Sequence, residues 1–286
     1  MMGTMFSVAE RLWEISRMKA DYHTHTNFST DADRESSPEV MIQGAIKRGL
    51  ETICITDHMD KDYDAEGKGF VFDTEKYFET LQSLREKYKE KIHIRIGVEL
   101  GLQPHLGQFA KEYVNAHPFD FVIGSTHMLR GRDPYYRANF EELTDQELYR
   151  GMFEETLTNI KNIEDFDVMG HLDYIVRYGL EQEKSYSYDE NKDLIDEILK
   201  HLVENGKGLE LNTAGLKYGL SFAHPYPAVL KRYRELGGEI VTVGSDGHKP
   251  EHIAYDFHKV ENILLDCGFK YYTEFRQRKP IFKQVR

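Results

Sequence analysis

The sequence predicts an α/β fold in which seven parallel strands close into a barrel, and two features of its 286 residues carry this prediction. Strand-like runs alternate with helical runs along the chain, which is typical of parallel strands joined by right-handed crossovers. Six of the seven strand-like runs end on His, Asp or Glu, and the seventh ends on Asn212. The carboxyl ends of parallel barrel strands all open on one face, whereas only the ends at a switch point meet in an open doubly wound sheet. A polar site that draws on nearly every strand therefore favours the barrel.

The strand-like runs are short and apolar, and several are rich in β-branched residues, as expected of buried strands. The first ends at residues 21–25, and the others are expected at 52–56, 92–98, 119–124, 166–170, 209–211 and 240–244. Helix signals lie between them: Pro38 opens one helix and Gly49 ends it, and Thr144 and Glu147 stand at capping-box spacing. The other helices are expected at 74–89, 106–116, 189–204 and 227–236, with a last one ending near residue 268.

The chain is expected to form a single domain over residues 1–286, because no repeat, low-complexity segment or linker interrupts it. Residues 1–19 are expected to add a short helical extension packed on the domain, because Phe6, Leu12 and Trp13 provide apolar positions after a capping-box pattern. The basic tail at residues 270–286 is expected to form an edge strand followed by a loose end.

The composition restricts the classes of partner. The chain is 40% hydrophobic and 30% charged, as in ordinary globular proteins, and its net charge of −12 argues against a nucleic-acid surface. An anionic substrate remains compatible with this charge, because bound divalent ions reverse the potential inside a pocket. Cys54 and Cys267 have no metal or redox spacing, and no segment has membrane-spanning length or the pattern of a secretory signal. We therefore expect a cytoplasmic protein with no membrane partner, and its oligomeric state stays open.

Imidazoles and carboxylates gather at the predicted strand ends. His23 and His25 stand two positions apart where the first strand ends, so their side chains point to the same side. The candidate metal ligands are His23, His25, Asp31, His58, Glu99, His127, His171, Asp246 and His248. Zinc takes about four protein ligands, so this set suits two or three ions that share a bridging carboxylate. Nitrogen and oxygen ligands without sulfur suit zinc, manganese or iron.

Each position also has an interpretation without metal. Asp57 and Asp246 could cap helices that follow strands, and Glu99 could be a solvated residue beside a turn. The remaining histidines show no such pattern: His93 faces away from the apolar positions of its strand, and His224 is left unassigned. The others lie in or beside helical runs and are expected at the surface: His105, His117, His201, His252 and His258. Because chance would have to place the same residue types at the same strand end repeatedly, the metal site is the favoured interpretation.

Such a centre predicts phosphate-ester hydrolysis. Ions held a few ångströms apart would bind a bridging water, lower its pKa toward about 7, and clamp the oxygens of a phosphate. The sequence has no G-x-S-x-G nucleophile motif, no Walker loop and no G-x-G-x-x-G fingerprint. Hydrolysis by a metal-bridging hydroxide is therefore the simplest interpretation, and a metal-binding protein without catalysis is the alternative from another class.

Seven blocks of the sequence resemble those of the polymerase and histidinol phosphatase (PHP) family. These blocks are DYHTHTNFSTD, ITDH, GVELG, IGSTHM, GHLDYIVRYG, LELNTAG and VGSDGH. The resemblance runs from Asp21 to about Cys267, and the length, single domain and GHLDYIVRYG block are most similar to the stand-alone histidinol-phosphatases. It implies a distorted seven-stranded (β/α)7 barrel, similar to a TIM barrel, with three divalent ions.

The resemblance also implies how the ligands divide. One ion would be held by His23, His25, Glu99 and Asp246. Glu99 would bridge to a second ion, which His127 and His171 also hold, and Asp31, His58 and His248 would hold the third. Some relatives have histidine at the position of Asp31, which leaves the identity of the third ion open. The implied reaction is hydrolysis of L-histidinol phosphate in histidine biosynthesis, with Glu99, Asp246 and His248 as catalytic residues.

Substrate-binding residues are expected near the same strand ends. Arg177 follows His171 by six residues and is the first candidate for the phosphate, since guanidinium pairs with phosphate oxygens through two hydrogen bonds. Arg130 and Arg132, on a loop that could close over the substrate, and Asn212 are further candidates. The alternative substrates within the same family are nucleotides or other small phosphate monoesters.

Overall fold

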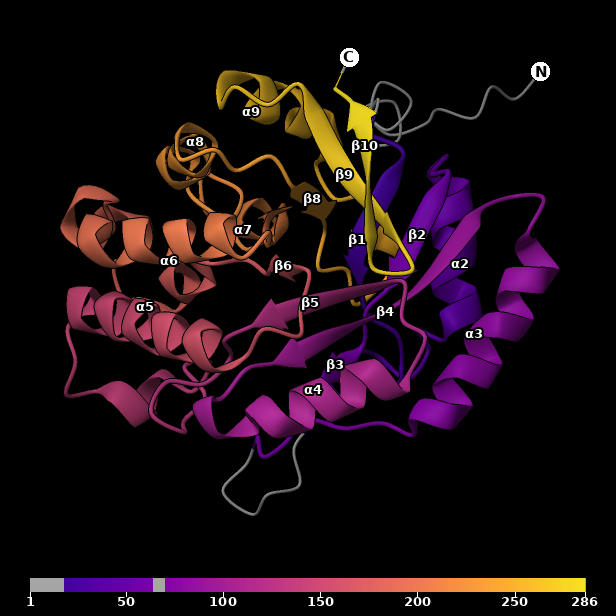
Figure 1. Cartoon of the computed structure of the whole chain (residues 1–286), viewed down its shortest axis with the longest axis horizontal. Helices are drawn as coiled ribbons and strands as arrows, with labels where there is room; N and C mark the ends of the chain where they lie inside the picture. Colours follow the sequence, from indigo (N-terminus) through magenta and orange to yellow (C-terminus); the bar gives the residue numbers. More distant parts are fainter. Residues whose placement is uncertain (1–17, 64–69, 286) are drawn as a thin grey trace, which may run out of the picture.

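The seven predicted strands form one parallel, nearly closed barrel in the order β1-β2-β4-β5-β6-β7-β8 (Figure 1). The structure is a computed structural model that describes residues 18–63 and 70–285, so residues 1–17 of the expected N-terminal extension lie outside it. The strands are β1 Ala20–Thr24, β2 Thr52–Ile55, β4 His93–Gly101, β5 Phe121–Ser125, β6 Val168–Met169, β7 Gly208–Asn212 and β8 Val241–Gly244. Thr24 bridges to Gly247 just after β8, which brings the last strand back to the first.

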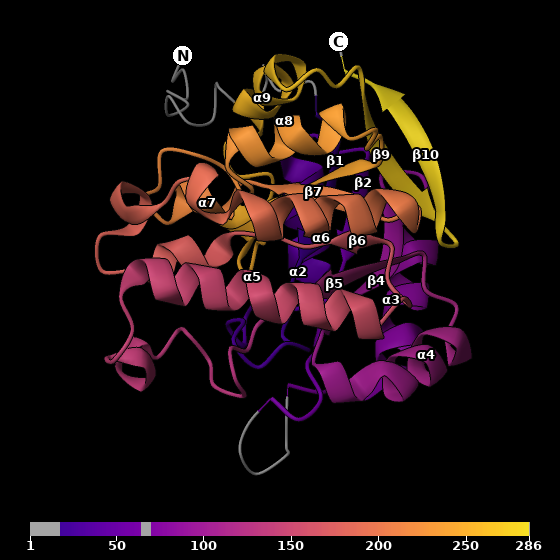
Figure 2. The same ribbon diagram turned by 60° about the vertical axis from the view of Figure 1, so that its left-hand side comes forward.

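Helices cover the outside of the barrel, and α5, α6 and α8 lie side by side in both views (Figures 1 and 2). The helices are α2 Pro38–Lys47, α3 Thr74–Tyr88, α4 Gly107–Ala116, α5 Asp145–Asn162, α6 Lys192–Glu204, α7 Ala214–Lys217, α8 Pro227–Glu235 and α9 Val260–Asp266. The predicted capping box of Thr144 and Glu147 opens α5, and Ser37 caps α2 ahead of Pro38. None of the described helices is long and apolar enough to cross a lipid bilayer.

Two irregularities at the carboxyl ends of the strands were not predicted. A two-residue strand, β3 (His58–Met59), pairs with β4 and places His58 beside Glu99. A bulge interrupts the pairing of β1 with β2 between Asp21 and Thr24, which is a way to re-aim side chains at the end of a strand. Asp57, considered above as a helix cap, instead accepts hydrogen bonds from the backbone and hydroxyl groups of Thr26 and Ser29. It thereby fixes the loop that follows His25.

The C-terminal tail forms a complete antiparallel hairpin of β9 (Tyr271–Arg276) and β10 (Lys279–Gln284), and the loose end expected there is absent from the described residues. The turn between the strands consists of Gln277 and Arg278, both with positive φ. Such turns usually carry Asn or Gly, and neither residue type marks this one. Contacts with the barrel stabilise it: Asp120 accepts hydrogen bonds from both turn amides, and Arg278 Nε lies 2.6 Å from Asp167 Oδ2.

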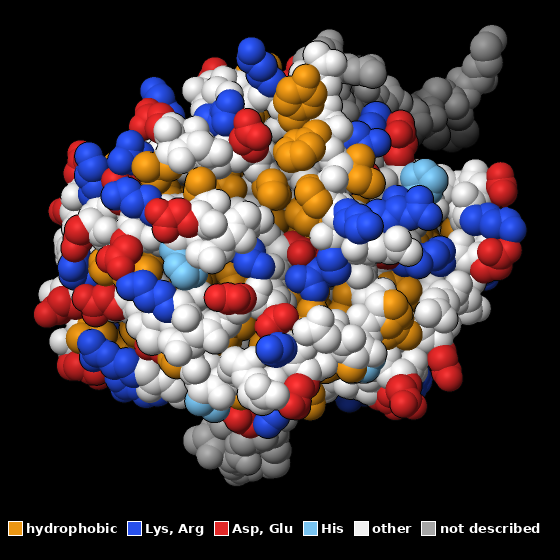
Figure 3. Space-filling model, in the orientation of Figure 1, with side chains coloured by type: hydrophobic (Ala, Val, Ile, Leu, Met, Phe, Trp, Pro, Cys, Tyr) orange, Lys and Arg blue, Asp and Glu red, His pale blue; other side chains and the backbone are white. Residues whose placement is uncertain are grey.

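The hairpin crosses the amino ends of the barrel strands, on the side away from the predicted site. Tyr22 Oη donates to the backbone oxygen of Phe275, and Thr52 at the start of β2 donates to Glu274. Hydrophobic side chains gather over this part of the surface (Figure 3), and Tyr271 and Phe282 of the hairpin are about half exposed.

Candidate metal centre

Glu99, near the carboxyl end of β4, lies fully buried at the middle of the predicted ligands. Its Oε2 is 3.1 Å from Nε2 of His23 and 3.1 Å from Nδ1 of His58. Its Oε1 is 3.1 Å from Nε2 of His127 and 2.9 Å from Nε2 of His171. One carboxylate thus faces four imidazoles from four different parts of the chain.

The remaining four predicted ligands adjoin this core. His25 Nε2 lies 3.4 Å from Glu99 Oε2 and 3.3 Å from Asp246 Oδ1. His248 Nε2 lies 3.0 Å from Asp31 Oδ2, and the same oxygen is 3.5 Å from His58 Nε2. The structure therefore brings together all nine side chains that the sequence singled out, although they span more than two hundred positions.

The donor set fits divalent cations. Five buried atoms that meet at the centre have no hydrogen-bond partner within the described chain: Nε2 of His23, His25 and His248, Nδ1 of His58, and Oε2 of Glu99. Buried polar atoms normally have hydrogen-bond partners. A cluster of buried nitrogen and oxygen atoms without partners therefore indicates a binding site for a cation. Three groups have ligand atoms close enough to share one ion: His23, His25 and Glu99; His58, Glu99 and His127; and His25, His58 and His248.

Glu99 and His25 are held in the protonation states that bind metal, whereas nearby carboxylates outweigh burial and raise the pKa values of His23, His58 and His127, from which metal would displace protons. Burial alone would raise the pKa of Glu99, but nearby imidazoles, His23 first among them, hold it well below its usual value. Burial lowers the pKa of His25 well below its usual value, and the charge of His248 lowers it further. An ionised carboxylate and a neutral imidazole are the forms in which these side chains coordinate a cation.

Two carboxylates that the sequence analysis missed hold the histidines in place. Glu210 of β7 is buried, and its Oε1 lies 2.7 Å from Nδ1 of His23 while Oε2 accepts from the backbone N–H of His171. Asp60, two residues after His58, lies 2.7 Å from Nδ1 of His127. Such partners fix the tautomer of a ligating histidine. Both had a signal in the sequence: Glu210 stands between two leucines of a buried strand, and Asp60 continues the strand-end pattern of His58.

Other buried groups brace the loops that carry the ligands. Asp246 has a left-handed backbone (φ 51°), and Lys217 Nζ donates to its carbonyl oxygen at 2.7 Å. Asp173 accepts from Tyr186 Oη, and its Oδ1 lies 2.7 Å from Nδ1 of His224. His224, unassigned from the sequence, is therefore a fully buried residue behind the centre.

A cavity of about 450 Å³ opens over the centre, and Arg177 lies on its wall. Arg177 is in the 3-10 helix Tyr174–Tyr178, and its guanidinium packs against the rings of Tyr174, Tyr178 and Tyr218. Its NH1 is buried without a hydrogen-bond partner in the described chain and lies 3.8 Å from Asp246 Oδ2. A guanidinium held in this way is ready to bind an anion that enters the cavity.

The structure does not bring the other substrate-binding candidates to this cavity. Arg130 is exposed, and Arg132 pairs with Glu142 outside it. Asn212 is buried beneath His23, where its side-chain oxygen accepts from the N–H of Ala214. His252, expected at the surface, is instead partly buried on the cavity wall.

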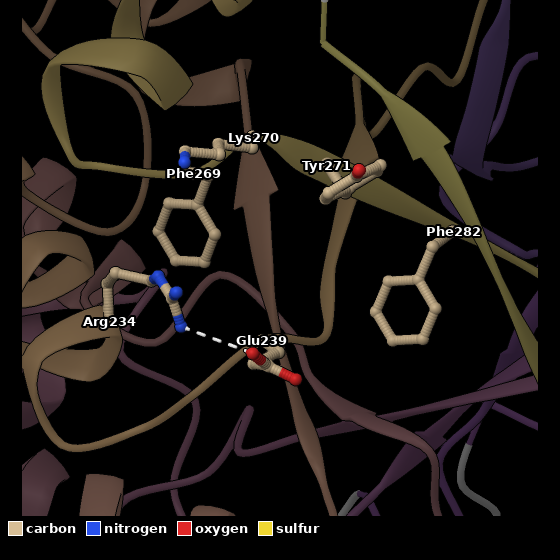
Figure 4. Close-up of a pocket in the computed structure, with 6 residues that line it drawn as sticks. All are labelled: Arg234, Glu239, Phe269, Lys270, Tyr271 and Phe282. Carbon is tan, nitrogen blue, oxygen red and sulfur yellow. Dashed lines mark ion pairs between the residues drawn. The ribbon is translucent and has the colours of Figure 1, made fainter.

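A second hollow of about 360 Å³ lies by the C-terminal hairpin, between residues such as Phe269, Tyr271 and Phe282 (Figure 4). Two of its three charged residues, Arg234 and Glu239, pair with each other at 3.6 Å, and the third is Lys270. It contains none of the predicted site residues, so the cavity over Glu99 is the candidate site.

Comparisons with known proteins agree with this geometry. The model of the PHP domain matches residues 21–214. The "Histidinol-phosphatase" of Lactococcus lactis subsp. lactis is 33% identical over 91% of this chain and 96% of its own. The "Probable histidinol-phosphatase" of Clostridium acetobutylicum is 34% identical over 88% of this chain and 95% of its own. The crystal structure of the Lactococcus lactis histidinol phosphate phosphatase, complexed with zinc, L-histidinol and phosphate, superposes with a TM-score of 0.83 at 32% identity, over 92% of this chain and 98% of that one.

Proposed function

Because the chain belongs to the PHP domain family, we propose that it is a metal-dependent phosphomonoesterase that hydrolyses L-histidinol phosphate to L-histidinol and phosphate. One observation carries the proposal: unsatisfied ligand atoms around Glu99 and the unsatisfied Nη1 of Arg177 adjoin the same cavity. The zinc, L-histidinol and phosphate in the Lactococcus lactis structure support the same ligands here.

The nine side chains would hold the ions, with Glu99 as the bridge and His23, His25 and Asp246 completing the first position. His127 and His171 would complete the second, and Asp31, His58 and His248 the third. The ions would supply a Lewis acid for the phosphoryl oxygens and lower the pKa of a bound water. His25 and His58 each belong to two of the three groups with converging ligand atoms, so these residues lie where neighbouring ions could share them.

Arg177 would bind the non-bridging oxygens of the phosphate and hold the phosphorus over the centre. Asp246 points Oδ1 toward His25 and Oδ2 toward Arg177. Its Oδ2 would accept a hydrogen bond from the attacking water and align it with the phosphate. Glu210 and Asp60 would keep the imidazoles of His23 and His127 in the tautomer whose Nε2 faces the centre.

We place this reaction in the cytoplasm, because both cysteines are free and buried, as in a protein of a reducing compartment. The substrate would be a small phosphorylated molecule rather than a nucleic acid, in keeping with the net charge of −12.

The test is phosphate release by protein loaded with zinc, manganese or iron. We expect the highest kcat/KM for L-histidinol phosphate, with lower values for nucleoside monophosphates and p-nitrophenyl phosphate. Chelation should abolish turnover and added metal should restore it. A preference for nucleotides would reassign the substrate, and no release from any ester would leave a metal-binding protein without catalysis.

Variants of two histidines, one in the proposed metal centre and one at the surface, test which residues bind metal. His127→Ala should lose bound metal, measured by elemental analysis, together with activity. His105→Ala is the matched control, because the side chain of His105 is 58% exposed and lies outside the cavity. Equal metal content in both variants would contradict the proposed centre.

A further inference from the structure

Four tyrosines and one aspartate, in contrast to the metal ligands at the centre, form the outer wall of the cavity over Glu99: Tyr63, Asp133, Tyr135, Tyr136 and Tyr178. Three of these residues come from the loop between β5 and α5, Tyr63 comes from the segment after β3, and Tyr178 ends the helix that carries Arg177. None of the five belongs to the predicted set of ligands. The wall thus combines aromatic rings with a single carboxylate.

Asp133 is fixed in place by neutral donors. The hydroxyl of Tyr63 donates to its Oδ2, and the backbone N–H of Tyr135 donates to its Oδ1 at 2.8 Å. Within the described ranges, no Lys, Arg or His lies within ion-pair distance of this carboxylate. The other three cavity carboxylates all face nitrogen atoms of the centre or of Arg177: Asp31 and Asp60 face histidines, and Asp246 faces histidines and Arg177. Asp133 therefore contributes a negative charge that no described side chain neutralises.

The tyrosine rings suit the same kind of ligand as this carboxylate. Tyr135 and Tyr178 lie 6.1 Å apart with their planes at 81°, and Tyr178 lies 5.7 Å from Tyr174. The faces of such rings attract cations, most strongly where water is excluded. A carboxylate oriented among aromatic rings is thus a site for a cationic nitrogen, and an unfavourable one for a second anionic group.

From this we infer that Asp133 and the tyrosines of the outer wall bind a cationic nitrogen in the alcohol part of the substrate, while Arg177 and the centre bind its phosphate. The inference rests on the proposed function and adds the basis of its specificity. L-Histidinol phosphate has a phosphate at one end and an amine and an imidazole at the other, so its charges match the two ends of the cavity. Nucleoside bisphosphates would place an anion near Asp133, and repulsion of that kind excludes competing substrates.

The test compares Asp133→Asn with wild-type protein, both loaded with metal. We would measure kcat/KM for L-histidinol phosphate and for p-nitrophenyl phosphate, which has no cationic nitrogen, and the affinity for L-histidinol by calorimetry. Loss of one charge-assisted contact should lower the ratio of the two kcat/KM values by about 10- to 100-fold and weaken L-histidinol binding by a similar factor. Glu141→Gln is the matched control, because it removes an exposed carboxylate of the same loop outside the cavity.

An unchanged ratio together with unchanged L-histidinol affinity in Asp133→Asn would overturn the inference and leave the proposed function standing. A wild-type protein that shows no preference for L-histidinol phosphate would instead overturn the proposed function, and L-histidinol affinity would then decide the role of Asp133. If Asp133→Asn does not fold, Tyr63→Phe removes only the hydroxyl that orients the carboxylate, and it must weaken L-histidinol binding.

Discussion

Glu210 Oε1 lies 2.7 Å from Nδ1 of His23, and both side chains are buried, on strands β7 and β1, which flank β8 in the barrel. Donation from Nδ1–H to this carboxylate would leave Nε2 of His23, which faces Glu99, as the atom that binds metal. The other oxygen of Glu210 accepts from the backbone N–H of His171. One carboxylate therefore orients two predicted ligands without facing the cavity itself.

Glu210→Gln should keep the shape of this contact and lose its charge. A neutral amide no longer favours the Nδ1–H tautomer of His23, so we expect metal affinity to fall by about 10- to 100-fold with the fold retained. Metal titration followed by calorimetry measures the change, and circular dichroism checks the fold. Metal affinity equal to that of the wild type would show that the backbone alone orients His23.

Gly244, at the end of β8, leaves the space in which Glu210 and His23 meet. A Cβ at this position would lie 2.3 Å from Glu210 Oε1 and 2.4 Å from the Cβ of His23. Gly244→Ala should therefore destabilise the protein by about 1–3 kcal/mol through overpacking and also weaken metal binding. Thermal unfolding with and without chelator measures both effects. In the control Gly151→Ala, the added Cβ meets only the flexible end of Leu129 at 3.3 Å, so near-normal stability is expected there.

The ligand set could be predicted because it depends on local rules. Strand periodicity places His23 and His25 on one side, and the alternation of strands and helices places every strand end on one face. The same rules would have found Glu210, whose position between two leucines of a buried strand points it toward the barrel interior. Glu210 lies inside β7 and not at its end, so the pattern of polar residues at strand ends does not include it.

Contacts between distant segments could not be predicted in this way. His224 is buried because Asp173, fifty-one positions earlier, accepts its hydrogen bond, and no local pattern marks such a pair. The Gln277–Arg278 turn forms without the usual turn residues because Asp120 and Asp167 hold it. The hydrogen bond between Tyr63 and Asp133, seventy positions apart, likewise depends on how two loops fold over the barrel.

His224 predicts a pH dependence of stability. Burial lowers its pKa, and the hydrogen bond with Asp173 only partly offsets this effect. The unfolded chain, with a histidine pKa of about 6.5, therefore binds more protons than the folded chain just below that pH. The stability that neutral His224 contributes is complete above about pH 6.5 and is lost as the pH falls toward the folded-state pKa, by at most about 1.4 kcal/mol per pH unit.

Urea unfolding of chelator-treated protein between about pH 5 and 7.5, the range around the histidine pKa, would measure this dependence. His224→Asn keeps a donor for Asp173 but does not titrate, so its free energy of unfolding should decrease less on acidification than that of the wild type. His105→Asn, at an exposed position, should retain the wild-type slope. Identical slopes for the wild type and His224→Asn would contradict the prediction.

Arg177→Lys tests whether the guanidinium binds phosphate through its planar pair of donors or only through its charge. Three tyrosine rings hold the guanidinium, and its buried NH1 has no hydrogen-bond partner in the described chain. Lysine keeps the charge but cannot make two parallel hydrogen bonds. We expect KM to rise by about 10- to 100-fold with a smaller change in kcat, and inhibition by inorganic phosphate to weaken by the same factor.

Arg132→Lys, at an arginine that pairs with Glu142 outside the cavity, should change neither constant. If kcat falls while KM and phosphate inhibition stay unchanged, phosphate binding in the ground state does not depend on Arg177. Arg177 would then stabilise only the transition state.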